Sequence, residues 1–249
     1  MIRYFGVLLA STALIAPARA ADKDAAPILD KAIQALGGEP ALAKVIASAT
    51  WNTEGELTYN GDVNPFKTHA TTRGSDHLRD EFSGDFGGTE IRGVRVLAGS
   101  KGWISMNDNV NEFDADAVAR EKHNHFQEIA PIAILPLKSQ GVKVEAEGEE
   151  AVEGKPAAKV KVTPKDGPDF TIFFDKESGL PLKMVGKAFN WQGEEYSREA
   201  TFSDYKEMGG IKKATKVVIK RDGSRFIDLT ITDFRPLESV PADAFDEPK

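Results

Sequence analysis

The sequence predicts an α+β protein built on a single curved antiparallel β-sheet, with a few helices covering its concave face. Three observations support this prediction. Apolar and polar residues alternate with a period of two along most of the chain, turn residues separate these segments, and helical periodicity is confined to two regions. Because the expected loops are short, neighbouring strands must run antiparallel.

Residues 1–20 have the composition of a secretory signal peptide. Arg3 supplies the positive start, residues 5–15 supply an apolar run, and Ala18-Arg19-Ala20 forms a small-x-small cleavage site. The apolar run is shorter than the roughly 20 residues that a membrane-spanning helix needs, although an uncleaved anchor is the alternative. We therefore expect cleavage after Ala20, a periplasmic protein without stable membrane insertion, and one domain over residues 21–249.

The amino-acid composition excludes cysteine chemistry and argues against binding to nucleic acid. The chain contains no cysteine, which excludes disulfides, thiolate chemistry and a lipidated cysteine at the cleavage point. Its formal net charge is −7, with acidic and basic residues mixed along the sequence. Such a chain is a poor match for nucleic acid or for an anionic lipid surface. Binding to the apolar part of a lipid stays open.

Two short helices are expected first, at residues 27–36 and from Pro40 to about Ala47. Apolar residues recur at helical spacing in residues 27–36, Pro27 suits a first turn, and Gly37-Gly38 suits a helix end. The period then changes to two, which predicts hairpin-connected strands. The expected N-terminal strands are residues 51–59, 66–73, 77–82, 92–98 and 103–106.

The middle of the chain is expected to be helical. Asp114 can cap a helix from Ala115 to about Ile129, and Pro131 and Pro136 are expected to interrupt the segment after it. Strands resume at Val142 and continue in hairpins, with Asp222-Gly223 as the strongest tight-turn signal. In total we expect about ten or eleven strands. The remaining expected strands are residues 158–163, 170–175, 180–187, 195–205, 215–221 and 224–234.

The sequence offers no catalytic set. His123-Asn124-His125 places two imidazoles about 200° apart around a helix, whereas helical metal ligands sit four residues apart, so we expect solvated histidines rather than a metal site. No Gly-x-Ser-x-Gly elbow is present. We expect a protein that is not an enzyme and that needs no cofactor and no metal, although a hydrolase with dispersed residues is a third hypothesis.

Apolar residues on the expected strands are the candidate ligand site. A curved sheet has a long concave face, and helices that cover it loosely would leave an apolar pocket, whereas tight packing would leave a filled core. We expect residues 131–137 to act as a lid, and Arg73, Arg79, Arg92 and Arg95 are candidates to bond it, with surface ion pairs as the alternative. The candidate cavity and lid residues are Trp51, Leu57, Phe66, Phe82, Val96, Trp103, Ile132, Ile134, Leu135, Phe173 and Phe202.

Five short stretches occur in a characteristic order. The first combines ALGG at 35–38 with WNTEG at 51–55, and the other four are LAGSKGW at 97–103, FDKESGLPL at 174–182, FSDYKE at 202–207 and DFRPL at 233–237. Together they resemble the LolA/LolB-like superfamily of periplasmic outer-membrane lipoprotein-sorting proteins, in its uncharacterised branch. FDKESGLPL is the most specific of the five, and the series spans most of residues 21–249.

This resemblance implies a half-open antiparallel β-barrel whose mouth is covered by helices. In the lipoprotein carriers the apolar interior holds acyl chains, and no residue is catalytic. A strand arginine of the carriers bonds to the lid and keeps it closed, and we assign this role to Arg73. The first hypothesis is therefore a monomeric periplasmic carrier for a lipid, lipoprotein acyl chains or another apolar ligand. The second is a non-catalytic cell-envelope structural or protein-interaction module with a filled core and an envelope protein as its partner.

Overall fold

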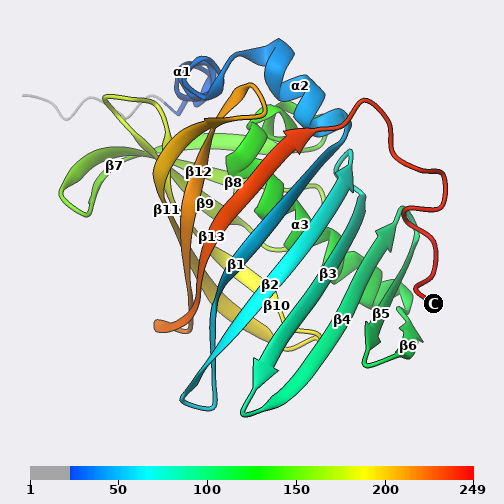
Figure 1. Cartoon of the computed structure of the whole chain (residues 1–249). Coiled ribbons are helices and arrows are strands. Elements are labelled where there is room, and N and C mark those ends of the chain that lie inside the picture. The colour runs from blue at the N-terminus through cyan, green and yellow to red at the C-terminus, as the bar shows by residue number, and fades with distance from the viewer. Residues whose placement is uncertain (1–22) are drawn as a thin grey trace, which may run out of the picture.

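The computed structural model describes residues 23–249, in which three α-helices and one 3₁₀ helix accompany thirteen β-strands (Figure 1). The expected signal peptide and its cleavage after Ala20 lie outside the described residues. The thirteen strands form one sheet, and every pairing in it is antiparallel. The predicted fold class, a curved antiparallel sheet with helices on its concave face, is confirmed.

The sheet consists of two meanders, which are joined where the first strand of the chain pairs with the last. Strands β1 to β6 follow one another in sheet order, strands β7 to β13 do the same, and β1 pairs with β13. The strands are β1 (Ala49–Tyr59), β2 (Asp62–Arg73), β3 (His77–Phe86), β4 (Thr89–Ala98), β5 (Lys101–Met106), β6 (Asn109–Glu112), β7 (Lys143–Val152), β8 (Lys155–Thr163), β9 (Phe170–Asp175), β10 (Pro181–Phe189), β11 (Glu195–Met208), β12 (Ile211–Arg221) and β13 (Ser224–Pro236).

The count of thirteen strands exceeds the ten or eleven expected. Strand β6 has no sequence signal, because Val110 is its one apolar residue and a period of two needs several. It forms by pairing with β5 across the turn at Asn107 and Asp108, both of which have positive φ.

Helices α1 (Ala26–Leu36) and α2 (Glu39–Ala47) cover one end of the curved sheet, as predicted (Figure 1). Helix α1 buries one face against the sheet, including Leu29 and Leu36. The corner between the helices needs Gly37, whose φ is 130° and where an added Cβ would lie 3.0 Å from the Gly210 carbonyl oxygen. This close approach seats the helix pair on the turn between β11 and β12.

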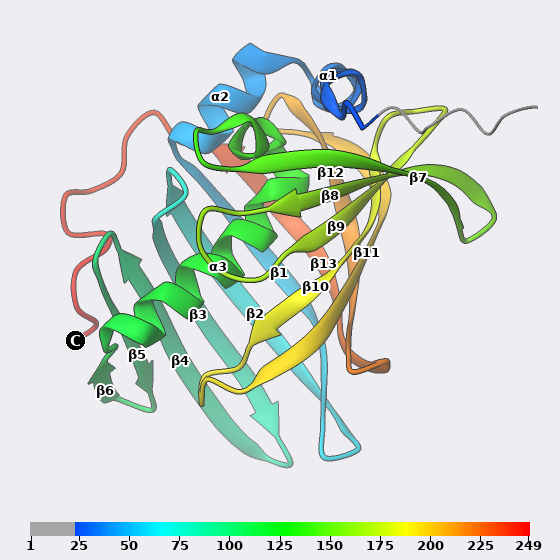
Figure 2. The ribbon, with the colours of Figure 1, turned by 180° about the vertical axis from the view of Figure 1, so that it is seen from behind.

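Helix α3 (Ala115–Ala133) crosses the concave face of the sheet (Figure 2). The Asp114 carboxylate accepts a hydrogen bond from the Ala117 amide at 2.7 Å, which is the predicted N-cap. The prediction that Pro131 interrupts the helix was wrong. The helix continues to Ala133 because Pro131 sits in its last turn, where one hydrogen bond is lost, and it ends at Ile134 with a φ of 59°.

Apolar packing occurs on both faces of the sheet. The main core joins α1, α2 and the C-terminal end of α3 to the concave face of the C-terminal strands. A smaller cluster on the outer face contains Val96, Trp103 and Phe245, where the C-terminal tail runs over β4 and β5 (Figure 1). None of the helices in residues 23–249 combines the length and apolar content that crossing a bilayer requires.

Candidate functional site

Helix α3 crosses the concave face without filling the space beneath it. A cavity of about 380 Å³ remains between the helix and the sheet. This volume lies within the roughly 300–1,000 Å³ that is typical of small-molecule sites. The apolar residues of its lining include Trp51, Leu57, Phe66, Phe82, Ile104, Ile132, Phe202, Val217, Ile219, Phe226, Leu229 and Ile231.

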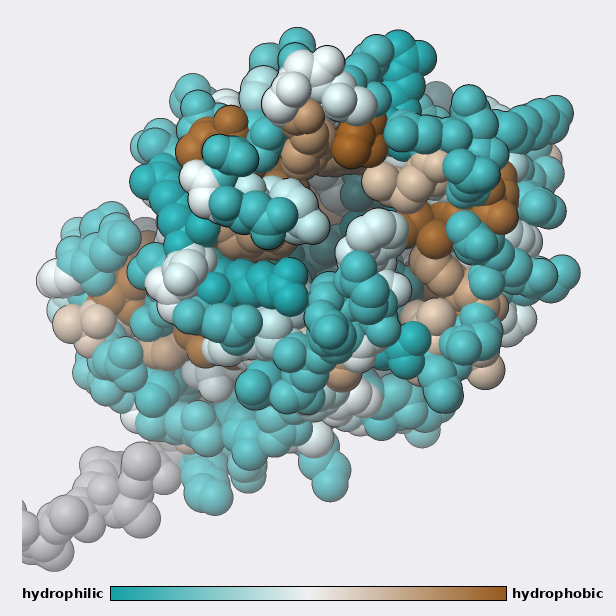
Figure 3. Space-filling model, turned by 90° about the horizontal axis from the view of Figure 1, so that it is seen from below, coloured by the Kyte–Doolittle hydropathy of each residue, from teal (hydrophilic) through white to brown (hydrophobic). Residues whose placement is uncertain are grey.

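The cavity opens at the end of the sheet away from α1 and α2. Viewed from that end, the molecule is hollowed at its centre and hydrophobic residues lie at the rim of the hollow (Figure 3). Trp191, in the turn between β10 and β11, belongs to the lining and is 65% exposed. Leu57 and Phe226, each close to a hairpin turn, belong to the lining as well. An apolar chain can therefore enter along the strands.

Six of the eleven candidate residues line this cavity. Five of them lie on strands, at positions whose side chains point to the concave face, and the sixth, Ile132, lies on α3. These residues are Trp51, Leu57, Phe66, Phe82, Ile132 and Phe202.

The other five were assigned wrongly to the cavity. Val96 and Trp103 face outward and pack under the C-terminal tail, and Phe173 faces outward beneath the ammonium group of Lys183. Alternation shows that a strand has two faces, but the second face also carries apolar residues wherever a tail or a lysine stem covers it. Ile134 and Leu135 pack into the main core beyond the helix end instead.

A half-buried charge cluster ties α3 to the sheet. The Arg95 guanidinium on β4 lies 3.1 Å from a Glu121 oxygen and 3.5 Å from a Glu128 oxygen, both on α3. On the neighbouring strand β3, Asp80 lies 3.2 Å from the same guanidinium. Glu128 also lies 3.8 Å from Arg198 on β11. We call Asp80, Arg95, Glu121 and Glu128 the Arg95 cluster.

Burial and charge act in opposite directions within the Arg95 cluster. Burial alone would raise the pKa of Glu128, but Arg95, His125 and Arg198 together outweigh burial and hold that pKa well below its usual range. For Asp80 and Glu121, burial outweighs the attraction of Arg95 and raises the pKa of each carboxyl. Glu128 is therefore the firmly ionised partner that fixes the helix to Arg95.

The latch assignment to Arg73 was wrong. Arg73 lies at the end of β2, where its guanidinium sits 5.0 Å from the ring centroid of Phe245 in the C-terminal tail. Arg95, one of the four arginines considered, contacts the helix instead. Nothing close to Arg95 in the chain indicates this role, because its acidic partners on α3 lie 26 and 33 residues further along.

No protein-family model matches the chain, and a search of curated proteins finds no match. Many solved structures match, and several match along most of their length. A LolA superfamily protein from Nitrosomonas europaea covers 90% of this chain and 97% of its own, with 12% identity and a TM-score of 0.59. The chain has the fold of the LolA superfamily. The resemblance predicted from the sequence is therefore confirmed at the level of the fold.

Two further structures share this LolA-like fold. A domain from Vibrio parahaemolyticus described as an outer membrane lipoprotein-sorting protein has 14% identity and a TM-score of 0.56, over 90% of this chain and 97% of that one. A DUF1329 family protein from Desulfovibrio piger has 14% identity and a TM-score of 0.55, over 90% and 98%. At these identities the likeness establishes the fold alone.

Polar side chains of α3 make the second attachment within the LolA-like fold. Strand β9 stops pairing with β10 at Gly186, so the later backbone groups of β10 lack a partner strand on that side. His123 and Gln127 donate hydrogen bonds to the Lys187 carbonyl, at 2.9 and 2.8 Å. Asn124 donates to the Phe189 carbonyl at 2.8 Å and accepts from its amide at 3.0 Å. The helix thus takes the place of a neighbouring strand.

The prediction of solvated histidines was wrong. His123 and His125 are both buried, and burial lowers the pKa of His123. The helix positions that carry them are polar in sequence, but His123 meets an open backbone carbonyl of β10 and His125 lies beside Glu128 of the Arg95 cluster rather than in water. In residues 23–249 no group of three histidine, cysteine or acidic side chains could hold a metal ion.

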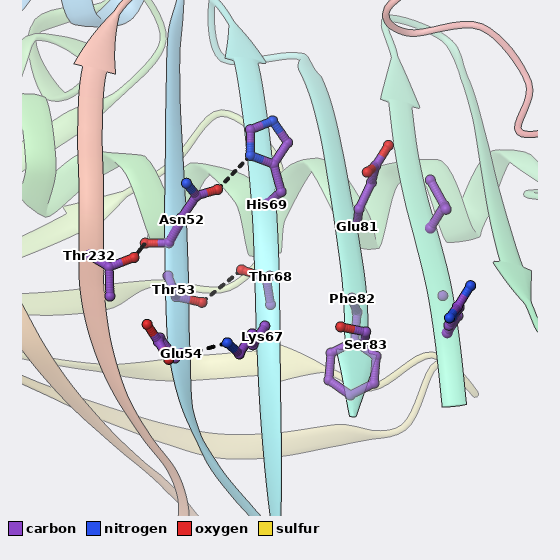
Figure 4. Close-up of a pocket in the computed structure, with 13 residues that line it drawn as sticks. Asn52, Thr53, Glu54, Lys67, Thr68, His69, Glu81, Phe82, Ser83 and Thr232 are labelled. Carbon is purple, nitrogen blue, oxygen red and sulfur yellow. Dashed lines mark hydrogen bonds and ion pairs between the residues drawn. The ribbon is translucent and has the colours of Figure 1, made fainter. Parts of the chain in front are cut away.

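A second hollow, of about 520 Å³, lies on the outer face of β1 to β4 (Figure 4). Its side chains pair with one another across the strands. Asn52 lies 2.6 Å from the His69 ring and Lys67 lies 3.5 Å from Glu54. These exposed pairs explain the hollow as ordinary sheet surface, which leaves the cavity under α3 as the stronger candidate site.

Proposed function

We propose that the protein binds a lipid, the acyl chains of a lipoprotein or another apolar ligand in the cavity between α3 and the sheet, and carries it through the periplasm. The observation that carries this proposal is an unfilled, largely apolar cavity beneath a helix whose middle is attached to the sheet by polar contacts. The proposal involves no catalysis and no cofactor. It treats residues 21–249 as one exported domain that acts as a monomer.

The chemistry of the lining supports an acyl chain as the ligand. Each methylene that moves from water into an apolar site contributes about 0.8 kcal/mol, so a chain of several methylenes provides useful affinity without specific polar contacts. The aromatic side chains Trp51, Phe66, Phe82 and Phe202 offer broad apolar surfaces. The shared fold with an outer membrane lipoprotein-sorting domain supports the same ligand class.

The attachment of α3 supports a carrier that loads and unloads its ligand. Ion pairs and side-chain hydrogen bonds can exchange with water when the helix lifts, at a lower cost than exposing a tightly packed apolar interface. The Arg95 cluster and the contacts of His123, Asn124 and Gln127 with β10 are of this kind. Motion of α3 would thus widen the cavity while the sheet stays intact.

Filling the cavity tests the proposal. Val217 lines the cavity on β12, and the next residue, Val218, does not. Val217→Trp is expected to weaken binding of decan-1-ol, measured by isothermal titration calorimetry, because excluding even three methylenes costs about 2.4 kcal/mol, or roughly 50-fold in affinity. Val218→Trp is the matched control and should bind like the unmodified protein. Equal affinities for both variants would place the ligand elsewhere.

A protein-interaction role is the second candidate, and exposed apolar residues favour it. Trp191 is 65% exposed, and Tyr59 and Val63, which flank the turn between β1 and β2, are each 59% exposed. These residues lie on hairpin turns, where an envelope protein could dock. Tyr59→Ser together with Val63→Ser, neither of which lines the cavity, would weaken such a complex but leave binding of decan-1-ol to the isolated protein intact, which separates the two roles.

A further inference from the structure

Lys213 is a buried lysine that faces the cavity. It lies on β12 and its side chain belongs to the cavity lining, although the residue is only 5% exposed. Its neighbours Lys212 and Lys216 on the same strand are exposed. Burying an ammonium group is costly unless an anion accompanies it, so a lysine at this position needs an explanation beyond strand surface chemistry.

The ammonium group has no acidic partner in residues 23–249. No hydrogen bond or ion pair of the described side chains reaches its Nζ, and its closest described interaction is with the Phe234 ring, whose centroid lies 5.7 Å away. That distance permits a cation–π attraction, which compensates for burial only in part. Burial is the cause that lowers the pKa of Lys213 to about 7.

The other charged groups of the cavity lining hold one another. Arg95 contacts Asp80, Glu121 and Glu128, and Arg198 lies 3.8 Å from Glu128. None of these acids contributes to the pKa of Lys213. Within the described part of the chain, Lys213 is thus the cavity-lining cation that has no acidic partner.

The position of Lys213 gives the cavity a polar inner end and an apolar outer end. Phe234, which Lys213 contacts, stacks on Trp51 at 6.0 Å, and both belong to the strand ends near α1 and α2. Leu57 lies six residues further along β1 toward the opening, a distance of about 20 Å in an extended strand. Apolar side chains of the sheet, including Phe66, Val217 and Leu229, belong to the same lining.

From this arrangement we propose that Lys213 binds the anionic headgroup of a single-chain amphiphile, of the long-chain carboxylate class, whose chain runs outward along the sheet. One ammonium supplies one charge and three donors, which suits a carboxylate. A cavity of about 380 Å³ is small for a ligand with two long chains, which favours a single chain. The proposal rests on the apolar-ligand function above and specifies its ligand.

The test compares two ligands that differ only in the headgroup. The delipidated protein, Lys213→Met and the matched control Lys212→Met are each titrated with decanoate and with decan-1-ol at pH 7 by calorimetry. A hydrogen bond to a charged group in a buried site corresponds to a preference of about 10-fold or more, so the unmodified protein and Lys212→Met are expected to favour decanoate by that factor. Lys213→Met is expected to lose the preference for decanoate, because the carboxylate would be buried without a cation, and to keep its affinity for decan-1-ol.

The outcomes separate this inference from the proposed function. A preference for decanoate that survives in Lys213→Met would overturn the role of Lys213. Equal binding of both ligands by the unmodified protein would overturn the anionic headgroup and leave the apolar-ligand function standing. Binding of neither ligand would overturn both. Lys213→Met should fold, because it removes a buried unpaired charge, and thermal unfolding checks this directly.

Discussion

Replacing Arg95 with glutamine is expected to lower the free energy of unfolding by about 1.5–3 kcal/mol, as is usual when hydrogen bonds to a charged group are lost. The change leaves the half-buried carboxyl groups of Asp80, Glu121 and Glu128 without their shared cation. The pKa of Glu128 should then rise, because burial remains and the attraction of Arg95 is lost, while His125 and Arg198 still lower it. Chemical denaturation and an NMR titration of Glu128 measure the two effects.

Arg92→Gln is the matched control for this experiment. Arg92 lies on the same strand, but its side chain is exposed and pairs with the exposed Glu90 at 2.9 Å. Such surface pairs contribute about 0–1 kcal/mol, so the control should change stability little. Equal losses in the two variants, or an unchanged pKa of Glu128 in Arg95→Gln, would show that the Arg95 cluster does not hold α3.

Replacing Lys213 with methionine is expected to stabilise the protein, and the gain should depend on pH. Burial lowers the pKa of Lys213 in the folded protein to about 7, whereas the unfolded value is near 10.4. Between these values the unfolded chain holds the proton and the folded protein does not, so the stability of the unmodified protein rises with pH across this window. Below pH 7 the folded protein bears the full cost of burying the charged ammonium group, roughly 4 kcal/mol.

The measurement is the free energy of unfolding of both proteins from pH 6 to pH 10. Lys213→Met should exceed the unmodified protein by up to roughly 4 kcal/mol at pH 6–7, and the difference should shrink toward zero near pH 10. Lys212→Met, with an exposed side chain, should follow the unmodified protein at every pH. A gain for Lys213→Met that is the same at pH 7 and pH 10 would show that packing, rather than a buried charge, causes it.

Local patterns were sufficient to predict most of the fold. The alternation along residues 51–59, the Asp222-Gly223 turn and the Gly37-Gly38 helix end each determine structure through neighbours in the chain, and each was confirmed. The same alternation placed Trp51, Leu57 and other residues correctly on the concave face. These features depend on backbone geometry that adjacent residues control.

The remaining features depend on contacts between distant segments. Trp103 was expected in the cavity, but the C-terminal tail covers it on the outer face, and nothing near Trp103 in sequence indicates the path of that tail. His123 was expected to be solvated, but it bonds to a strand 64 residues away. Lys213 was not considered, because a lysine among strand residues normally marks the solvated face. It lies an odd number of residues from Lys212 and from Lys216 and so points to the opposite face of the strand, which is the one weak signal in the sequence.

The central claim, that an apolar ligand occupies the cavity under α3, is tested most directly by native mass spectrometry. The full chain is expressed with its N-terminal segment, purified from the periplasm without detergent, and compared with Val217→Trp before lipid extraction. The account predicts a chain of residues 21–249 that carries a stoichiometric lipid, which is reduced or lost in Val217→Trp. A ligand-free mass for the unmodified protein, together with no uptake of decan-1-ol, would contradict it and favour the protein-interaction module.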